Sequence, residues 1–326
     1  MRNALIALLA TATPALAAGP EFTVYAPEYF ASEWGPGPKI EAGFESICAC
    51  DLVFVTGDVL PRVLLEGEGT KADAVIGLSI DQTLRARESG LFAPHGEDVS
   101  GLTMPFAWDD PVFLPFNWSE TAFIYDETRL ANPPKSFREL VDAPDDLKIV
   151  IQDPRSSVSG LALLLWMEEV FGDEGTAAAW EKLKPKILTV TQGWSEAYGM
   201  FTDGEADMVL SFTTSPAYHI GAEGDMTKHA AIFQEGHYLL AELAAQLNGT
   251  DQPELAQQFM NYILSPDFQG MIAEANWSYP SKLPEDQLPD SFKALPKTPK
   301  TIWLPEDEAE SRRKDALETW LSVFAR

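Results

Sequence analysis

The amino-acid sequence predicts an α/β protein built from two lobes. Short runs of β-branched and aromatic residues alternate with helical stretches, a pattern typical of parallel sheets with crossover helices. The alternation is interrupted at residues 115–119 and again at residues 235–238, as expected where a chain crosses from one lobe to another and returns. The length of 326 residues also exceeds what a single hydrophobic core usually organises.

The elements can be assigned in chain order. For the first lobe the sequence predicts strands at 22–25, 52–55 and 74–78, with helices at 39–47 and 59–66. For the second lobe it predicts strands at 122–125, 149–151 and 208–211, with helices at 161–171 and 175–183. Residues 18–117 and 239–276 are assigned to the first lobe, and residues 118–238 and 277–326 to the second.

The last helix is predicted to begin near Pro305. Four apolar residues recur there at the i, i+3, i+4 and i+7 spacing of one helix face, so this stripe is expected to pack against the body of the protein. They are Leu317, Trp320, Leu321 and Phe324.

Residues 1–17 have the organisation of a secretory signal peptide. A basic start at Arg2 is followed by an apolar run and by a small-residue ending at Ala15 to Ala17. The run is too short to span a bilayer, and no later apolar run approaches that length. We therefore predict an exported, soluble protein of the bacterial periplasm.

The chain is strongly acidic. Its formal net charge is −27, and removal of Arg2 with the signal peptide would make it −28. Nucleic acid and acidic membranes are poor partners for such a surface. The charge favours a cationic ligand, although an acidic surface suited to solubility in a salty habitat is an equally good interpretation.

Few residues suggest catalysis or metal binding. Cys48 and Cys50 are separated by one residue, which fits a local disulfide or two thiols near the end of a helix but no zinc site. Gly193 to Ala197 resembles a nucleophile elbow only loosely, because the second glycine and the Asp and His partners are missing. Phosphate loops and dinucleotide fingerprints are also missing. We predict no catalytic residue, no metal and no cofactor.

Two neighbouring segments combine stacking side chains with hydrogen-bond donors, at residues 193–199 and 211–219. A pocket for a flat, polar, cationic molecule needs this composition, because aromatic faces attract cations and hydroxyl groups fix orientation. The candidates are Trp194, Phe212 and Tyr218 for stacking, with Ser195, Thr213, Thr214 and Ser215 for hydrogen bonding.

Further candidates occur at strand ends and beside small residues. Ser157 lies where a strand passes into a helix, and free N–H groups there can hold a polar ligand head, although simple N-capping explains the serine equally well. Gly57 and Asp58 follow the end of a strand, where they can belong to a ligand site or simply form a turn. Trp34 and Trp277 have polar or glycine neighbours, so they are as much candidates for a ligand site as for packing.

Taken together, several segments resemble the periplasmic thiamine-binding proteins of thiamine ABC transporters. The likeness covers nearly the whole mature chain. It is carried by residues 33–38, 48–50, 152–155, 163–167, 193–199, 213–220, 235–238 and 276–280.

The resemblance implies a type II periplasmic binding protein whose two α/β lobes close by a hinge on thiamine, thiamine monophosphate or thiamine diphosphate and deliver it to a membrane permease. We predict that it acts as a monomer. The resemblance also implies the ligand-binding positions. They are Gly57, Asp58, Ser157, Val158, Trp194, Phe212, Thr213, Thr214, Ser215, Tyr218 and Trp277, with Trp34 as an addition.

The chain departs from the family pattern in three places. Tyr25-Ala26-Pro27 stands where the family has Tyr-x-Tyr, so Tyr29 would have to substitute for the second tyrosine. Phe212 replaces a tyrosine, and the segment around Gly57 is shortened. A changed preference among thiamine and its phosphates is therefore expected.

Two other functions stay open at this point. One is a carrier of the same fold for another cation, such as a polyamine or a ferric complex. The other is an enzyme that degrades thiamine, which would need a cysteine nucleophile; Cys48 and Cys50 lie too early and too close together to suit that role.

Overall fold

The computed structural model describes residues 19–325, so the predicted signal peptide lies outside the described residues. Eight strands form one continuous path in the order β2-β1-β3-β10-β5-β8-β6-β7. They are β1 (Glu21–Ala26), β2 (Asp51–Thr56), β3 (Ala74–Ser79), β5 (Leu114–Asp126), β6 (Ile149–Gln152), β7 (Ile187–Thr191), β8 (Met208–Phe212) and β10 (His237–Leu247). Short strands pair at the side of this path: β4 (Phe92–Ala93), β9 (Lys228–Ala231), β11 (Tyr279–Pro280) and β12 (Thr301–Ile302).

The first half of the path is a parallel sheet closed by an antiparallel neighbour. β1 pairs in parallel with β2 and β3, and β10 pairs antiparallel with β3. One of its cores gathers around Phe22, Phe44 and Phe259. The helices of this half are α1 (Glu28–Ala31), α2 (Gly37–Cys48), α3 (Val59–Glu66), α4 (Thr83–Glu88), α9 (Pro253–Ile263) and α10 (Pro266–Met271).

The second half has the same plan. β6 pairs in parallel with β7 and β8, and β5 pairs antiparallel with β8. Its core gathers around Phe137, Trp166 and Phe233. The helices of this part and of the C-terminal segment are α5 (Phe137–Val141), α6 (Val158–Leu183), α7 (Trp194–Thr202), α8 (Pro216–Tyr218), α11 (Asp290–Lys293) and α12 (Glu306–Phe324).

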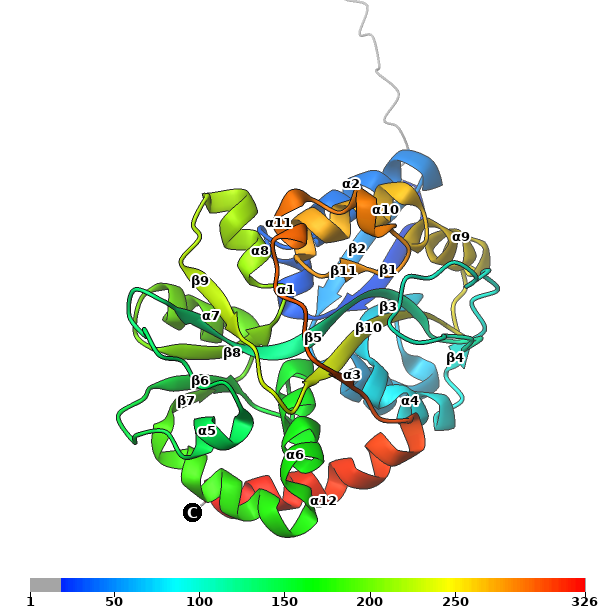
Figure 1. The fold of residues 1–326 in the computed structure, drawn as a ribbon. Coiled ribbons are helices and arrows are strands. Elements are labelled where there is room, and N and C mark those ends of the chain that lie inside the picture. Colours follow the sequence, from blue (N-terminus) through cyan, green and yellow to red (C-terminus); the bar gives the residue numbers. More distant parts are fainter. Residues whose placement is uncertain (1–18, 326) are drawn as a thin grey trace, which may run out of the picture.

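β5 and β10 join the two halves through the middle of the molecule (Figure 1). The first part of β5 pairs with β10, whereas Thr121 to Tyr125 pair with β8. The break in the alternation expected at 115–119 is wrong, since these residues continue the long strand β5, whose side chains are nearly all buried. The passage from one half to the other, which the sequence predicts at this place, runs through that strand. The sheet is mixed rather than purely parallel, since β5 and β10 run against their neighbours. The assigned lobe boundaries stay a prediction.

Several local predictions are confirmed. The helices predicted at 161–171 and 175–183 are the two arms of α6, separated at Gly172, whose φ of 67° and ψ of 169° are not helical. α12 begins after Pro305 and packs on α6, with Trp320 buried. Between the two states that the sequence leaves open for Cys48 and Cys50, the structure has the disulfide, at the end of α2.

Short helical turns complete the described part of the chain. Two of them, η4 (His219–Glu223) and η5 (Ile272–Asn276), are π-helical and border the site described below. The others are η1 (Gly67–Gly69), η2 (Ile80–Gln82), η3 (Lys184–Lys186) and η6 (Glu285–Gln287). None of the helices within residues 19–325 combines the length and apolar character that a bilayer crossing requires.

Candidate ligand-binding site

Two adjoining cavities lie where side chains from both halves of the sheet meet. We call the first, of about 420 Å³, the aromatic compartment and the second, of about 490 Å³, the polar compartment. They form one continuous cleft, because the same residues line both. These shared residues are Tyr29, Val158, Ser159, Trp194 and Ser195.

Several large aromatic rings line the aromatic compartment. Tyr218 and Trp277 meet edge to face, with ring centroids 5.5 Å apart. Trp194 lies 6.0 Å from Trp34, which approaches from the segment between α1 and α2, and stacks on Tyr198 at 4.6 Å. Trp194, Tyr218 and Trp277 thus face one shared cavity, as the sequence predicts. Aromatic faces arranged in this way suit a flat ring, and a cationic one in particular.

Irregular backbone places two of these rings. Tyr218 immediately precedes the π-helical turn η4, and Trp277 immediately follows the π-helical turn η5. Trp277 has a φ of 53°, in the left-handed region that bulky residues rarely adopt. Both π-helical turns and strained non-glycine residues concentrate at functional sites. The irregular backbone and the aromatic side chains therefore both indicate a functional site at the aromatic compartment.

Hydrogen bonds fix the Trp194 indole and the wall behind it. Its Nε1 donates to Ser211 Oγ at 2.8 Å, and Ser211 Oγ is 2.7 Å from Ser215 Oγ. Beside them, Tyr198 Oη lies 2.9 Å from His219 Nε2. His219 Nδ1 in turn lies 2.6 Å from Glu223 Oε2, at the edge of the compartment.

The charged side chains that line the aromatic compartment are both acidic, Glu223 and Glu242. Among the described residues, no lysine, arginine or histidine joins them in the lining. Glu242 lies on β10 and is 5% exposed. Burial raises the pKa of its carboxyl to about 7, because the charged form is costly away from water.

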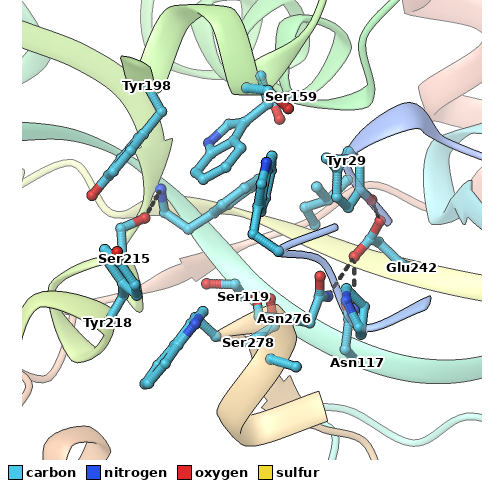
Figure 2. Close-up of a pocket in the computed structure, with 18 of the residues that line it drawn as sticks. Tyr29, Asn117, Ser119, Ser159, Tyr198, Ser215, Tyr218, Glu242, Asn276 and Ser278 are labelled. Carbon is cyan, nitrogen blue, oxygen red and sulfur yellow. Dashed lines mark hydrogen bonds between the residues drawn. The ribbon is translucent and has the colours of Figure 1, made fainter. Parts of the chain in front are cut away.

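Three side chains hold the Glu242 carboxyl at one end of the compartment (Figure 2). Asn117 Nδ2 donates to Oε2 at 2.6 Å and Asn276 Nδ2 donates to the same oxygen at 3.3 Å, while the Tyr29 hydroxyl donates to Oε1. Asn117 and Asn276 each begin a glycosylation-like Asn-x-Ser sequence. Their amides serve the cleft instead, and Asn117 is buried.

The polar compartment lies at the start of α6. It is lined by Gly57 and Asp58 from one half of the molecule and by Arg155, Ser156 and Ser157 from the other. Ser157 is the N-cap of α6, and its Oγ accepts from the N–H of Gly160 at 3.5 Å. Free N–H groups at such a helix start attract anions.

The charges of the polar compartment are mixed. The Arg155 guanidinium forms a bidentate ion pair with Asp153, and this pairing lowers the pKa of Asp153. Partial burial, and then the nearby Asp153, raise the pKa of Asp58. A phosphate would thus meet one arginine already paired, together with carboxylates.

One hydrogen bond joins the two halves across the cleft. The Ser195 hydroxyl on α7 donates to Glu28 Oε2 on α1 at 3.0 Å. With the contact between Trp34 and Trp194, this bond spans from the β1–β3 half to the β6–β8 half.

The structure brings most of the predicted residues to this cleft. Trp34, Phe212, Ser215, Tyr218 and Trp277 line the aromatic compartment, Gly57, Asp58 and Ser157 line the polar compartment, and Val158 and Trp194 line both. Thr213 and Thr214 line neither compartment. They are 3% and 1% exposed, and Thr214 Oγ1 is hydrogen-bonded to Ser119 Oγ, which does line the cleft. Tyr29 is present at the cleft, where it can replace the missing tyrosine of the early strand.

Sequence reasoning missed Asn117, Ser119, Tyr198, Glu242 and Asn276 as lining residues. The signal for Glu242 was visible: it is the single charged residue in the otherwise apolar run from Tyr238 to Ala245. A lone carboxylate in a buried strand needs a partner or a role. The two asparagines then supply donors for that carboxylate.

Comparison with known proteins gives the family. Residues 54–300 match the model of bacterial extracellular solute-binding proteins. The chain belongs to this family. Within it, the chain is 45% identical over 317 residues to the thiamine-binding periplasmic protein of Brucella abortus, covering 96% of this chain and 95% of that protein. It is 42% identical to the thiamine-binding periplasmic protein of Escherichia coli over the full length of both.

Solved structures agree with this assignment. A periplasmic thiamin binding protein superimposes with a TM-score of 0.91 at 43% identity, covering 94% of this chain and 97% of that one. The ferric binding protein of Campylobacter jejuni shares the fold, with a TM-score of 0.76 at 16% identity over 93% of this chain and 99% of that one. The predicted two-lobed, type II binding-protein fold is thus confirmed, and extracellular solute-binding proteins are transport components rather than enzymes.

Proposed function

We propose that this solute-binding protein binds thiamine in the aromatic compartment and delivers it, in the periplasm, to the permease of an ABC importer. The observation that carries the proposal is the lining of that compartment: aromatic rings and two carboxyl groups, without a cationic side chain among the described residues. The identities of 45% and 42% to two thiamine-binding periplasmic proteins support it.

The chemistry of thiamine fits this lining. Its thiazolium ring carries a fixed positive charge, and both of its rings are flat. Tyr218, Trp277, Trp194 and Trp34 offer faces and edges within reach of one ligand, and a desolvated cation–π contact contributes up to about 2 kcal/mol. The compartment of about 420 Å³ falls within the size range of small-molecule sites.

Thiamine monophosphate and diphosphate can enter the same cleft. In our proposal their rings occupy the aromatic compartment and their phosphates extend past Trp194 into the polar compartment, towards Ser157 and the start of α6. The carboxylates there and the paired state of Arg155 oppose a doubly charged phosphate. We therefore expect thiamine to bind more tightly than either ester.

The structure gives less support to the other candidate functions. His219, Glu223 and Asp225 approach one another, but both His219 nitrogens are bonded and Asp225 is paired with Lys228, so this group is committed to the fold rather than free for a ferric ion. A thiamine-degrading enzyme would need a cysteine thiolate, and Cys48 and Cys50 are joined in a disulfide. A polyamine remains as a competitor for the acidic cleft.

Delivery requires that the permease distinguish the loaded protein from the empty one. Closure of two lobes about a hinge is the usual means. The Ser195–Glu28 hydrogen bond and the Trp34–Trp194 contact join the two sides of the cleft and would form only in the closed state. We propose that the protein acts as a monomer that closes on its ligand.

Titration calorimetry of the refolded, ligand-free protein tests the proposal. We expect a one-to-one complex with thiamine with a Kd below about 1 μM, an interaction of more than about 8 kcal/mol, and much weaker binding of spermidine and ferric citrate. Trp277→Ala should weaken binding, whereas Trp303→Ala, which removes an exposed indole stacked on Phe106 away from the cleft, should not. Absence of heat and of fluorescence change with thiamine would refute the assignment.

A further inference from the structure

The Glu242 carboxyl is the most unusual charged group of the cleft. It receives hydrogen bonds from Tyr29 on α1, Asn117 on β5 and Asn276 on η5, and it faces the cavity together with them. These donors are all neutral. A carboxylate so placed is solvated by three dipoles, and no cationic side chain among residues 19–325 is paired with it.

Resting on the proposed function, we propose that Glu242 is the counter-ion of the ligand's cationic ring, and that a fixed cation expels a proton from Glu242 when it binds. The reaction is balanced in charge and in atoms. The protonated protein and the singly charged cation give the complex of carboxylate and cation, and the proton passes from the carboxyl oxygen to the buffer. Above the titration range of the empty site, the cation binds without proton release.

The titration range follows from burial. Because burial raises the pKa of Glu242 to about 7 in the empty protein, about half of the molecules carry the proton at that pH. A positive ring beside the carboxyl favours its charged form and lowers that pKa in the complex. Protons then bind more strongly to the empty protein than to the complex, so lowering the pH weakens binding of the cation.

On the described elements around Glu242, no other acidic side chain is placed to serve as the counter-ion of the ligand. On β5, Glu120 accepts from Thr298 and Thr301. On α1, Glu28 accepts from Ser195, and on η5, Glu274 is exposed. Gly77 on β3 has no side chain to charge. Glu223, across the compartment, is 44% exposed and bonded to His219.

Local strand geometry gives Glu242 this position. Glu242 on β10 is paired with Asn117 on the neighbouring strand β5, and the register between these strands shifts between Glu242 and Leu243. Such a bulge re-aims side chains and is common next to functional sites. The carboxyl and its asparagine donor are therefore placed side by side by the sheet itself.

The test is the pH dependence of thiamine affinity, measured by calorimetry between pH 6 and pH 8.5. We expect the Kd of the natural protein to rise by up to about tenfold per pH unit below pH 7, and to level off above pH 8. Near pH 7, the heats of binding in two buffers should differ by about half the difference between the ionisation enthalpies of those buffers, because about half a proton is released per ligand. This second measurement needs no variant.

Two variants make the result specific. Glu242→Gln should bind thiamine about tenfold or more weakly at pH 8, as when one partner of a buried charge pair is removed, and should lose the proton release. Asp81→Asn is the matched control. Asp81 is also buried, at 2% exposure, and accepts a hydrogen bond of 2.7 Å from the Tyr238 hydroxyl. Because Asp81 lines neither compartment, this variant should keep both the affinity for thiamine and its pH dependence.

The outcomes separate the two proposals. Equal thiamine affinity at pH 6 and pH 8, without proton release, would overturn the role of Glu242 and leave thiamine binding intact. The same pH dependence in Glu242→Gln as in the natural protein would overturn it as well, since protonation of the ligand's own pyrimidine ring affects both proteins alike. Absence of thiamine binding at every pH would refute the proposed function itself.

Discussion

The aromatic and polar compartments share one wall, formed around Val158 and Trp194, yet they offer a ligand opposite surroundings. In the aromatic compartment, rings from both halves of the molecule enclose two carboxyl groups, one of them deeply buried. In the polar compartment, a helix start and Arg155 face Asp58 and Glu28. The difference shows how one cleft can bind a cationic ring in one compartment and accommodate the hydroxyethyl or phosphate group of that ligand in the other.

The largest expected effect concerns the rings. Trp277→Ala removes an indole from the wall of the aromatic compartment, and truncation of a central aromatic contact typically costs at least about 2 kcal/mol. We expect thiamine and its phosphates to lose affinity alike, by about thirtyfold or more. Calorimetry with thiamine and thiamine monophosphate checks this. A loss restricted to the phosphate esters would place the rings of thiamine in the polar compartment, opposite to the assignment proposed here.

The next effect concerns stability and involves the buried carboxyl. Burial raises the pKa of Glu242 from an ordinary value of 4.5 to about 7, so the folded, empty protein binds the proton more tightly than the unfolded chain. The carboxyl therefore destabilises the fold increasingly as the pH rises from about 4.5 to about 7, and fully above that. Asp58 in the polar compartment is only partly buried and should contribute less.

Glu242→Gln should consequently make the ligand-free protein more stable at pH 8, by about 1–3 kcal/mol, and change little at pH 5. Urea unfolding at the two pH values measures the difference. If Glu242→Gln instead lowered the free energy of unfolding at pH 8 and had less effect at pH 5, the three neutral donors would already compensate the buried charge.

A smaller effect should separate thiamine from its esters. Ser157→Ala removes the N-cap hydroxyl of α6 in the polar compartment. We expect thiamine monophosphate to bind about three- to tenfold more weakly, as is usual when one hydrogen bond is lost, while thiamine itself is unaffected. Competition between the two ligands reads out the ratio directly. If thiamine loses as much as the ester, Ser157 acts on the rings or on the fold instead.

The smallest effect belongs to the bond across the cleft. Ser195→Ala removes the hydroxyl that donates to Glu28 at 3.0 Å in an exposed position. A partly exposed hydrogen bond contributes on the order of 0.5–1 kcal/mol, so all ligands should bind about two- to fivefold more weakly. The dissociation rate, measured by stopped-flow fluorescence, should rise by the same factor. An unchanged rate would mean that this bond does not hold the closed state.

The sequence could predict the rings of the cleft more readily than its charges. Trp194, Tyr218 and Trp277 stand among small and polar residues, where a core aromatic is uncommon, and that local signal sufficed. The alternation of strands and helices likewise predicted the two-lobed plan. The strand directions could not be predicted in the same way, because β5 and β10 owe theirs to pairing partners far along the chain.

The rest of the site depends on register and on turns. Glu242, Asn117 and Asn276 come from three distant segments, and only the pairing of β10 with β5 and the end of η5 bring them together. Thr213 and Thr214 look like ligand donors in the sequence, and in the structure they are buried and line neither compartment. Local composition identifies a candidate, whereas tertiary geometry decides which way its side chain faces.

A crystal structure of the protein with thiamine would test the central claim most directly. We expect the two rings to lie in the aromatic compartment, between Trp194, Tyr218 and Trp277, with the positive ring on the side of Glu242. Thiamine bound outside that compartment, or with its cationic ring turned away from both carboxyl groups, would contradict this account.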